Sequence, residues 1–338
     1  MTEAAITDPT IQVSLDFAGY AAERERAQAA HQVDGAPDYG FSLDRRLLRQ
    51  LTAVRPIRVL ARSLVRLREP FFQQVNLMRM VEVGPRQFPR IHEMAAHCAR
   101  TLGIGLPRVF VEYQVLMNAY TYASDQTAPS IVLSTGLIEA MADDELLGVI
   151  GHECGHIHNL HSAYNTLVVI GSNQMAGVLQ NTAAAGGVSL PLIGSIAQAL
   201  SGGLMLFMMR WSRCAEITSD RAAVICTGDP DAAMRMLAKL MTGGAVTLEG
   251  MNLDEFMRQI GDIKVMPARV IELFQRHPIT AKRIAAVRWF AQSDVFGAWL
   301  PHRQRAGAVR PIAEIDRECE ALVQVWSQRG VPALMPER

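Results

Sequence analysis

The segment over residues 149–161 holds the side chains best suited to chemistry. Its sequence, VIGHECGHIHNLH, contains four of the nine histidines of the chain and one glutamate. His152 and His156 are four residues apart, so on a helix both imidazoles lie on one face at the spacing that a tetrahedral zinc requires. Glu153 lies beside them, where it could take a proton from a water that zinc acidifies. The HExxH pattern therefore predicts a hydrolytic zinc site that lacks only a third ligand.

The third ligand is predicted from a second segment, WSRCAEITSDRAA. Glu216 and Asp220 are one helical turn apart in it and lie on one face. We expect Glu216 to bind the metal, and Asp220 to accept the free imidazole N–H of a ligating histidine and so hold its tautomer. The alternative for such a pair is a solvated helix face. Trp211 and Cys214 are poor neighbours for a solvated face, which favours the metal site.

The remaining histidines and the cysteines are predicted to be structural. His158 is two residues beyond His156 and points away from the metal face, and His161 is also expected to serve the fold rather than the chemistry. The five cysteines are odd in number and show no paired CxxC spacing, a pattern typical of a reducing compartment. Cys154 is interpreted as a buried thiol.

The elements that must position these residues are mostly helical. The segment MADDELLGVIGHECGHIHNLH predicts a helix with Asp143 as its N-cap and acids in its first turn. Three short strands are predicted before it, from LPRVFVEY, LMNAYTYA and PSIVLSTGL. Amphipathic helices follow from Asp229 and Pro230 to the C-terminus. The predicted fold class is therefore mostly α (α+β), with a small sheet beside the HExxH helix.

An uncharged stretch separates the two metal-binding segments. Residues 162–209 contain no Asp, Glu, Lys or Arg, which predicts an apolar helical hairpin over 162–210. Because His156 and Glu216 must meet at one metal, this hairpin has to leave and return on the same side. Polar residues at 172–174 oppose deep insertion, so a hairpin in or on a membrane and one packed within the protein both remain open.

Charge and composition bear on partners. Basic and acidic residues both number 33, and this zero net charge predicts no nucleic acid partner. Possible lipid contacts are 164–211 and a basic amphipathic helix at 57–68, whose alternative is an arginine face in solvent. The start, MTEAAITDPT, does not have the pattern of a signal peptide. We expect the cytoplasmic side of a membrane, with a soluble cytoplasmic protein as the alternative.

Taken in order, these motifs resemble the HtpX-like zinc metallopeptidases, a gluzincin family that also contains the CAAX prenyl proteases. The resemblance rests on NAYTYA, IVLSTGLIEAM, ELLGVIGHECGHI, SRCAEITSDRAA and HPITAKRIAAV, over roughly residues 85–290. It implies the gluzincin fold and one Zn²⁺ per chain, held by His152, His156 and Glu216. It also implies that Glu153 is the general base and that Asp220 supports a ligating histidine.

The resemblance further implies how a polypeptide substrate is held. Asn118, Ala119 and Tyr120 match an edge strand that aligns the substrate backbone in extended form. His277 or Arg283 would stabilise the oxyanion of the tetrahedral intermediate. The alternative for His277 is that it begins a helix together with Pro278. Typical members begin with two transmembrane helices, and this chain does not match them, so its membrane topology stays open.

The predicted activity is zinc-dependent cleavage of unfolded or membrane-associated proteins, in protein quality control. The alternative is a catalytically idle, zinc-stabilised scaffold or membrane adaptor, against which the presence of Glu153 argues. The predicted parts are a flexible arm over 1–40, a basic helical region over 41–80, a metallopeptidase domain over 81–295 with the hairpin inserted at 162–210, and a helical extension over 296–338.

Overall fold

The computed structural model describes residues 31–61 without 34, 56 and 60, and residues 77–122, 129–162, 164–165, 168, 203–244, 250–261, 279–301 and 308–324. Most of the predicted hairpin and of the basic helix over 57–68 lies outside these residues, as does His277. In chain order the elements are β1 (Gln32–Val33), β2 (Ala36–Pro37), α2 (Ser42–Ala53), β3 (Val81–Glu82), α4 (Pro89–Leu102), β4 (Arg108–Glu112), β5 (Ala119–Tyr122), β6 (Ser130–Ser134), α5 (Thr135–Ala140), α6 (Asp143–His158), α9 (Gly203–Thr227), α10 (Pro230–Thr242), α12 (Leu253–Gly261), α14 (Thr280–Phe290), α15 (Asp294–Trp299) and α16 (Ile312–Val323).

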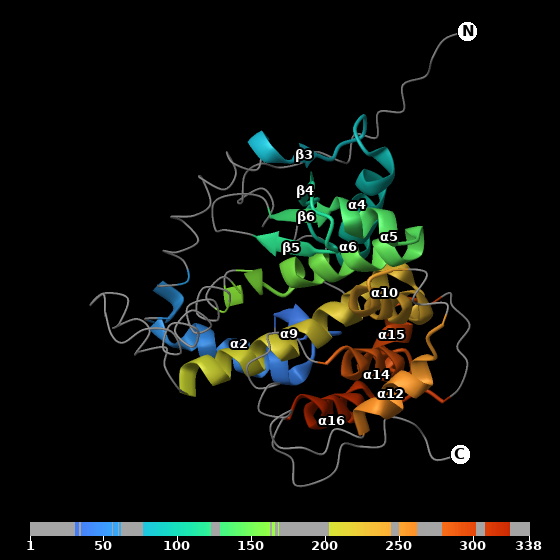
Figure 1. The fold of residues 1–338 in the computed structure, drawn as a ribbon. Coiled ribbons are helices and arrows are strands. Elements are labelled where there is room, and N and C mark those ends of the chain that lie inside the picture. The colour runs from blue at the N-terminus through green and yellow to red at the C-terminus, as the bar shows by residue number, and fades with distance from the viewer. Residues whose placement is uncertain are drawn as a thin grey trace, which may run out of the picture.

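The predicted small sheet is present beside the HExxH helix (Figure 1). Its strand order is β3-β4-β6-β5, with β4 and β6 parallel and β5 antiparallel to β6. Every residue of β6 is buried, because this strand lies between two others and is apolar at Ile131, Val132 and Leu133. Among the described strands, β5 pairs with β6 alone, so its other side is a free edge next to α6.

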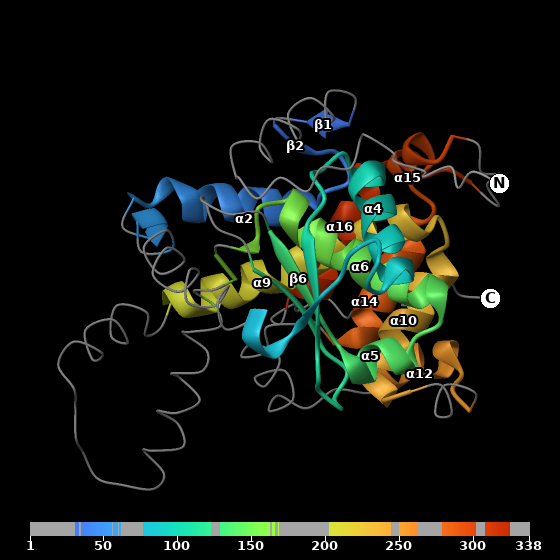
Figure 2. The same cartoon turned by 90° about the horizontal axis from the view of Figure 1, so that it is seen from above.

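Two helices, α6 and α9, form the centre of the helical part and pack against each other along their length (Figures 1 and 2). All residues of α9 from Trp211 to Cys226 are buried, because α2, α4, α6, α10, α14 and α16 surround it. A helix buried on all sides gives no solvated face to Glu216 and Asp220, and their charges must therefore be balanced inside the protein.

The start of α6 differs by one residue from the prediction. The N-cap is Ala142, and Asp143 is the first helical residue. The Glu145 side chain accepts a hydrogen bond from the Ala142 N–H at 2.8 Å, which is the contact that a glutamate at N3 makes to the N-cap residue in a capping box. Glu145 in turn forms a buried ion pair with Lys239 of α10. Glu145 therefore both supports the start of α6 and joins this helix to α10.

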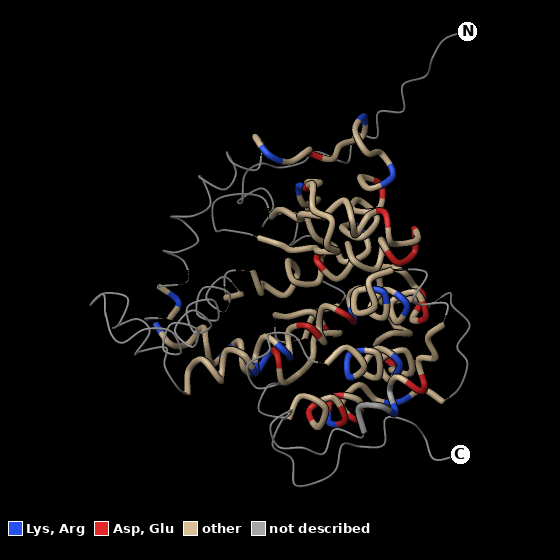
Figure 3. The backbone as a smooth tube through the Cα atoms, viewed as in Figure 1, with Lys and Arg blue, Asp and Glu red and all other residues tan. Residues whose placement is uncertain are grey.

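Basic and acidic segments lie near one another among α10, α12, α14 and α16 (Figure 3). The first turns of α9, residues 203–209, are uncharged and continuous with the rest of that helix, so the end of the predicted hairpin is part of the helix that carries Glu216. Among the helices that the structure describes, none has both the length and the hydrophobicity needed to cross a bilayer.

Candidate metal centre

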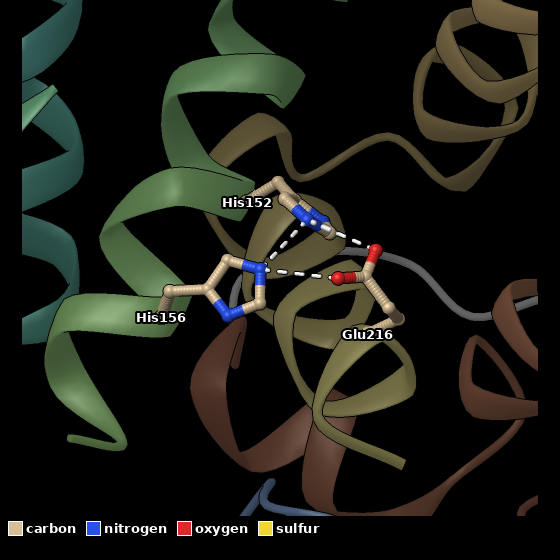
Figure 4. A group of neighbouring side chains, drawn as sticks. All are labelled: His152, His156 and Glu216. Carbon is tan, nitrogen blue, oxygen red and sulfur yellow. Dashed lines mark hydrogen bonds and ion pairs between the residues drawn. The ribbon is translucent and has the colours of Figure 1, made fainter. Parts of the chain in front are cut away.

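Three side chains from α6 and α9 converge on one point. His152 and His156 project from α6, and Glu216 projects toward them from α9 (Figure 4). Their ligand atoms all lie within 4.8 Å of one another, and all three side chains are buried. The structure thus brings together the three residues that the sequence predicted as ligands.

The spacing of these atoms fits zinc. Two ligands bound at 2.0–2.1 Å in a tetrahedron lie about 3.3 Å apart. The Nε2 atoms of His152 and His156 are 3.2 Å apart. The Glu216 carboxylate lies 3.6 Å from Nε2 of His152 and 3.5 Å from Nε2 of His156. Two imidazole nitrogens and a carboxylate are also a common donor set of catalytic zinc, which leaves a fourth position for water or substrate.

Asp220 contacts His152 at the ring nitrogen that faces away from Glu216. Its Oδ1 lies 3.0 Å from Nδ1 of His152, so the carboxylate accepts the proton on that nitrogen and leaves Nε2 facing Glu216. Arg283 of α14 binds the same carboxylate through Nε at 2.8 Å and Nη2 at 2.6 Å. Its Nη1 lies 3.1 Å from Oε2 of Glu216. One guanidinium therefore braces both carboxylates of α9.

The charged groups of the site shift the pKa values of their neighbours. Burial alone would raise the pKa of Asp220, but the Arg283 guanidinium holds it below its usual value. Burial would lower the pKa of His156, but the hydrogen bond and negative charge of Glu216 raise it. Three carboxylates, those of Glu153, Glu216 and Asp220, face one guanidinium. The excess of negative charge is what a divalent cation would balance.

The second histidine has its own support, and this was not predicted. After α6 ends, Leu160 adopts a left-handed φ of 60°, and the chain turns so that His161 N–H donates to the His156 carbonyl at 3.0 Å. Nδ1 of His161 then lies 3.0 Å from Nδ1 of His156. The expectation that His161 is only structural is therefore incomplete, because helical periodicity cannot be carried past the turn at Leu160.

The side chain of Glu153 on α6 contacts the edge strand β5. The Thr121 hydroxyl of β5 donates to Glu153 Oε2 at 2.6 Å, which holds the carboxylate beside the metal ligands. Thr121 was missed in the sequence because a threonine in a strand is ordinary, and its partner is 32 residues away. This hydrogen bond connects the strand predicted to bind substrate directly to the predicted base.

The structure also describes the predicted substrate-binding residues, His158 and the cysteines. Asn118 is exposed at the start of β5, and its backbone exchanges hydrogen bonds with Ser134, while Ala119 is half-buried and Tyr120 is 37% exposed. His158 points away from the ligands, as expected, and bonds to the Tyr39 hydroxyl at 2.9 Å. The five cysteines are all buried and free.

Two glycines of α6 permit the close approach of α9. A Cβ at Gly155 would lie 2.7 Å from Cβ of Ala222 and 3.0 Å from Cα of Ser219. A Cβ at Gly151 would lie 2.8 Å from Cβ of Cys226. Because these positions flank His152 and His156, the same close contact that packs the helices sets the distance from the histidines to the glutamate of α9.

The variant Gly155→Ala is expected to separate α6 from α9 and weaken metal binding. Overpacking of this kind costs about 1–3 kcal/mol, which exceeds the helix propensity gained with alanine, about 1 kcal/mol. Urea unfolding and zinc affinity would measure the two effects. Gly148→Ala is the matched control, because its Cβ would meet the flexible Met236 Sδ at 3.1 Å. Equal zinc affinity in both variants would contradict the proposed role of the glycine.

Comparisons with known proteins agree with this geometry. Residues 85–290, more than half of the chain, match the family described as Peptidase family M48. The chain is 26% identical over 245 residues to the "Plastoglobule-localized metallopeptidase 48, chloroplastic" of Arabidopsis thaliana, covering 70% of this chain and 67% of that protein. It is 28% identical over 213 residues to "Protease HtpX" of Hydrogenovibrio crunogenus, covering 58% and 68%.

Other similarities extend this picture. The chain is 25% identical over 226 residues to a "Protease HtpX homolog" of Moorella thermoacetica, covering 62% of this chain and 75% of that protein. A solved structure of S. mikatae Ste24p aligns with a TM-score of 0.41 and 19% identity, over 71% of this chain and 58% of that chain. The match to the family and to the two HtpX proteins confirms the resemblance to HtpX-like peptidases that the motifs predicted.

Proposed function

Because the chain belongs to peptidase family M48 and is therefore a metallopeptidase, we propose that it is a zinc-dependent endopeptidase acting on unfolded or membrane-associated proteins. The observation that carries the proposal is the convergence of His152, His156 and Glu216 within 4.8 Å, with Glu153 held beside them by Thr121. The first three residues would hold the metal, and Asp220 would fix the tautomer of His152.

The chemistry divides between the metal and the chain. When bound, zinc would acidify a water and polarise the carbonyl of the scissile bond. Glu153 accepts the proton of the attacking water and returns it to the leaving amine. Thr121 keeps the Glu153 carboxylate directed to this place. Arg283 contacts both Glu216 and Asp220 and so holds these two carboxylates in place. An oxyanion role for Arg283 or for His277 stays a prediction.

Substrate binding is proposed to occur along β5. A free strand edge can pair with any extended backbone, so it selects unfolded segments rather than a particular sequence. Thr121 of this strand touches Glu153, which would bring a paired substrate backbone close to the base and the metal ligands. Asn118, Ala119 and Tyr120 are the proposed contacts, and protein quality control is the proposed setting.

Removal of the metal tests this function. A strong chelator is expected to stop cleavage of an unfolded protein such as casein, and added zinc is expected to restore it. Cleavage would be followed by the appearance of fragments, together with the metal content of the protein before and after chelation. Undiminished cleavage by protein that has lost its metal would contradict the proposal.

The proposed location is the cytoplasmic side of a membrane, supported by two sequence features. These are the arginines of residues 57–68 and the uncharged stretch over 162–209. The protein is expected to sediment with vesicles of anionic lipid. Release by high salt would identify the arginine segment as the contact, and release by detergent alone would identify the uncharged stretch. Failure to sediment at low salt would contradict this location.

A further inference from the structure

Helix α2 contacts the metal centre although it lies outside residues 85–290, the part that matches the family. It packs against α9 through the buried side chains of Leu43, Leu47 and Leu51. On the same helix, Asp44 is only 1% exposed. Burial of a carboxylate on an otherwise apolar helix face is costly unless its charge is compensated. Packing alone therefore does not explain why Asp44 is buried.

A chain of hydrogen bonds connects Asp44 to the second histidine of the metal site. Oδ2 of Asp44 lies 3.0 Å from Nε2 of His161. Nδ1 of His161 lies 3.0 Å from Nδ1 of His156. The same carboxylate oxygen accepts a 2.6 Å hydrogen bond from the hydroxyl of Thr218 on α9, and this hydroxyl accepts the Phe41 N–H at 3.1 Å. All members of the chain are buried.

The donor and the acceptor of each of these hydrogen bonds follow from Asp44, the carboxylate at which the series ends. An ionised carboxylate only accepts, so His161 carries its proton on Nε2, next to Asp44. Nδ1 of His161 is then an acceptor and takes the proton on Nδ1 of His156. Nε2 of His156 is left without a proton, and it is the nitrogen that faces Glu216. The pair therefore selects the tautomer of His156 that is able to bind a metal.

The charges support the same conclusion. Asp44 forms a buried hydrogen bond with His161 at 3.0 Å. Because a neutral imidazole compensates a buried carboxylate poorly, a cation held by His156 would add to the compensation of this charge through His161. Asp220 contacts His152 directly, so each proposed histidine ligand is linked to one carboxylate, and for His156 this link runs through His161.

We propose that Asp44 and His161 are positioning residues for the metal ligand His156, so that α2 is a working part of the metal centre. This inference rests on the proposed function, since it requires His156 to be a ligand. Its consequence is that zinc affinity depends on a helix outside the family segment. Removal of such an outer partner weakens metal binding by about 10–100-fold.

Zinc affinity of the purified full chain tests this inference, measured by competition with a chromophoric chelator. Asp44→Asn keeps the shape of the side chain and removes its charge, and it is expected to weaken zinc binding by about tenfold or more. The visible spectrum of the Co²⁺-loaded protein is also expected to change, since it reports the ligand field at His156. Circular dichroism would show that the variant is folded.

Asp316→Asn is the matched control. Asp316 is also a buried carboxylate, and it holds the start of α2 through the Ser42 N–H at 3.0 Å and binds Arg221 at 2.7 Å. This variant is expected to lower thermal stability without changing zinc affinity or the Co²⁺ spectrum. If both variants lost affinity equally, the effect of Asp44 would be general destabilisation, and the inference would be overturned.

The remaining outcomes are also decisive. A folded Asp44→Asn protein with the affinity and spectrum of the wild type overturns the inference. If this variant does not fold, the double variant Asp44→Leu/His161→Leu replaces both partners by apolar groups, which a core tolerates, and the same loss of affinity is expected from it. Zinc binding that is unchanged in His156→Ala would refute the proposed metal site itself, whatever the result at Asp44.

Discussion

The variant Glu153→Gln is expected to lose peptide-bond cleavage and to keep its metal. Glutamine cannot take a proton from the attacking water, and loss of a general base lowers the rate by about 10²–10⁴-fold. Metal binding is expected to persist because His152, His156 and Glu216 are untouched. The amide oxygen can still accept the Thr121 hydrogen bond, so the local structure is retained. Casein cleavage and zinc content, measured on the same samples, would show both effects.

A matched control separates this effect from general damage. Glu139→Gln makes the same chemical change on the exposed surface of α5, and this variant is expected to cleave like the wild type. Cleavage by Glu153→Gln at the wild-type rate would exclude this residue as the base. If the wild type and Glu153→Gln both bind zinc and neither cleaves, the catalytically idle scaffold becomes the better explanation.

The largest loss of stability is expected from Arg283→Met. Arg283 is buried and contacts both Glu216 and Asp220. Burial alone would lower its pKa, but the two carboxylates raise it, so the guanidinium stays charged. Loss of one partner of a buried ion pair costs about 3–5 kcal/mol, because the remaining charges stay buried without compensation. Urea unfolding in the presence of a chelator would measure this loss.

Zinc and a second arginine provide the controls. Added zinc is expected to restore part of the stability of Arg283→Met, because a cation bound at Glu216 compensates that carboxylate. Arg288→Met changes the same helix at a more exposed ion pair, with Asp254 at 3.0 Å, and is expected to cost less than about 1 kcal/mol. Equal stability of the two variants would show that Arg283 is not the brace of the site.

The parts of the site predicted from sequence are those governed by local periodicity. His152, His156, Glu216 and Asp220 lie within single helices, where a spacing of four residues places side chains on one face. Three of the four strands of the sheet, β4, β5 and β6, were also predicted from short local patterns in the sequence. Such predictions need only the conformation of one element.

The parts that were missed depend on contacts between distant segments. Asp44 and His161 meet across 117 residues, and Thr121 and Glu153 across 32. No periodicity within one element indicates either pair. The contacts of Arg283 with Glu216 and Asp220 were not predicted either, because these partners on α9 are known only once α14 is packed there. Tertiary packing, not local pattern, decides these roles.

The position of bound zinc is the most direct test of the account. Anomalous X-ray scattering at the zinc absorption edge, from crystals of the full chain, would locate the ion without reference to activity. The account predicts one peak at about 2.0–2.2 Å from Nε2 of His152, Nε2 of His156 and the carboxylate of Glu216. Zinc bound elsewhere, or no zinc at these three residues in zinc-containing crystals, would contradict it.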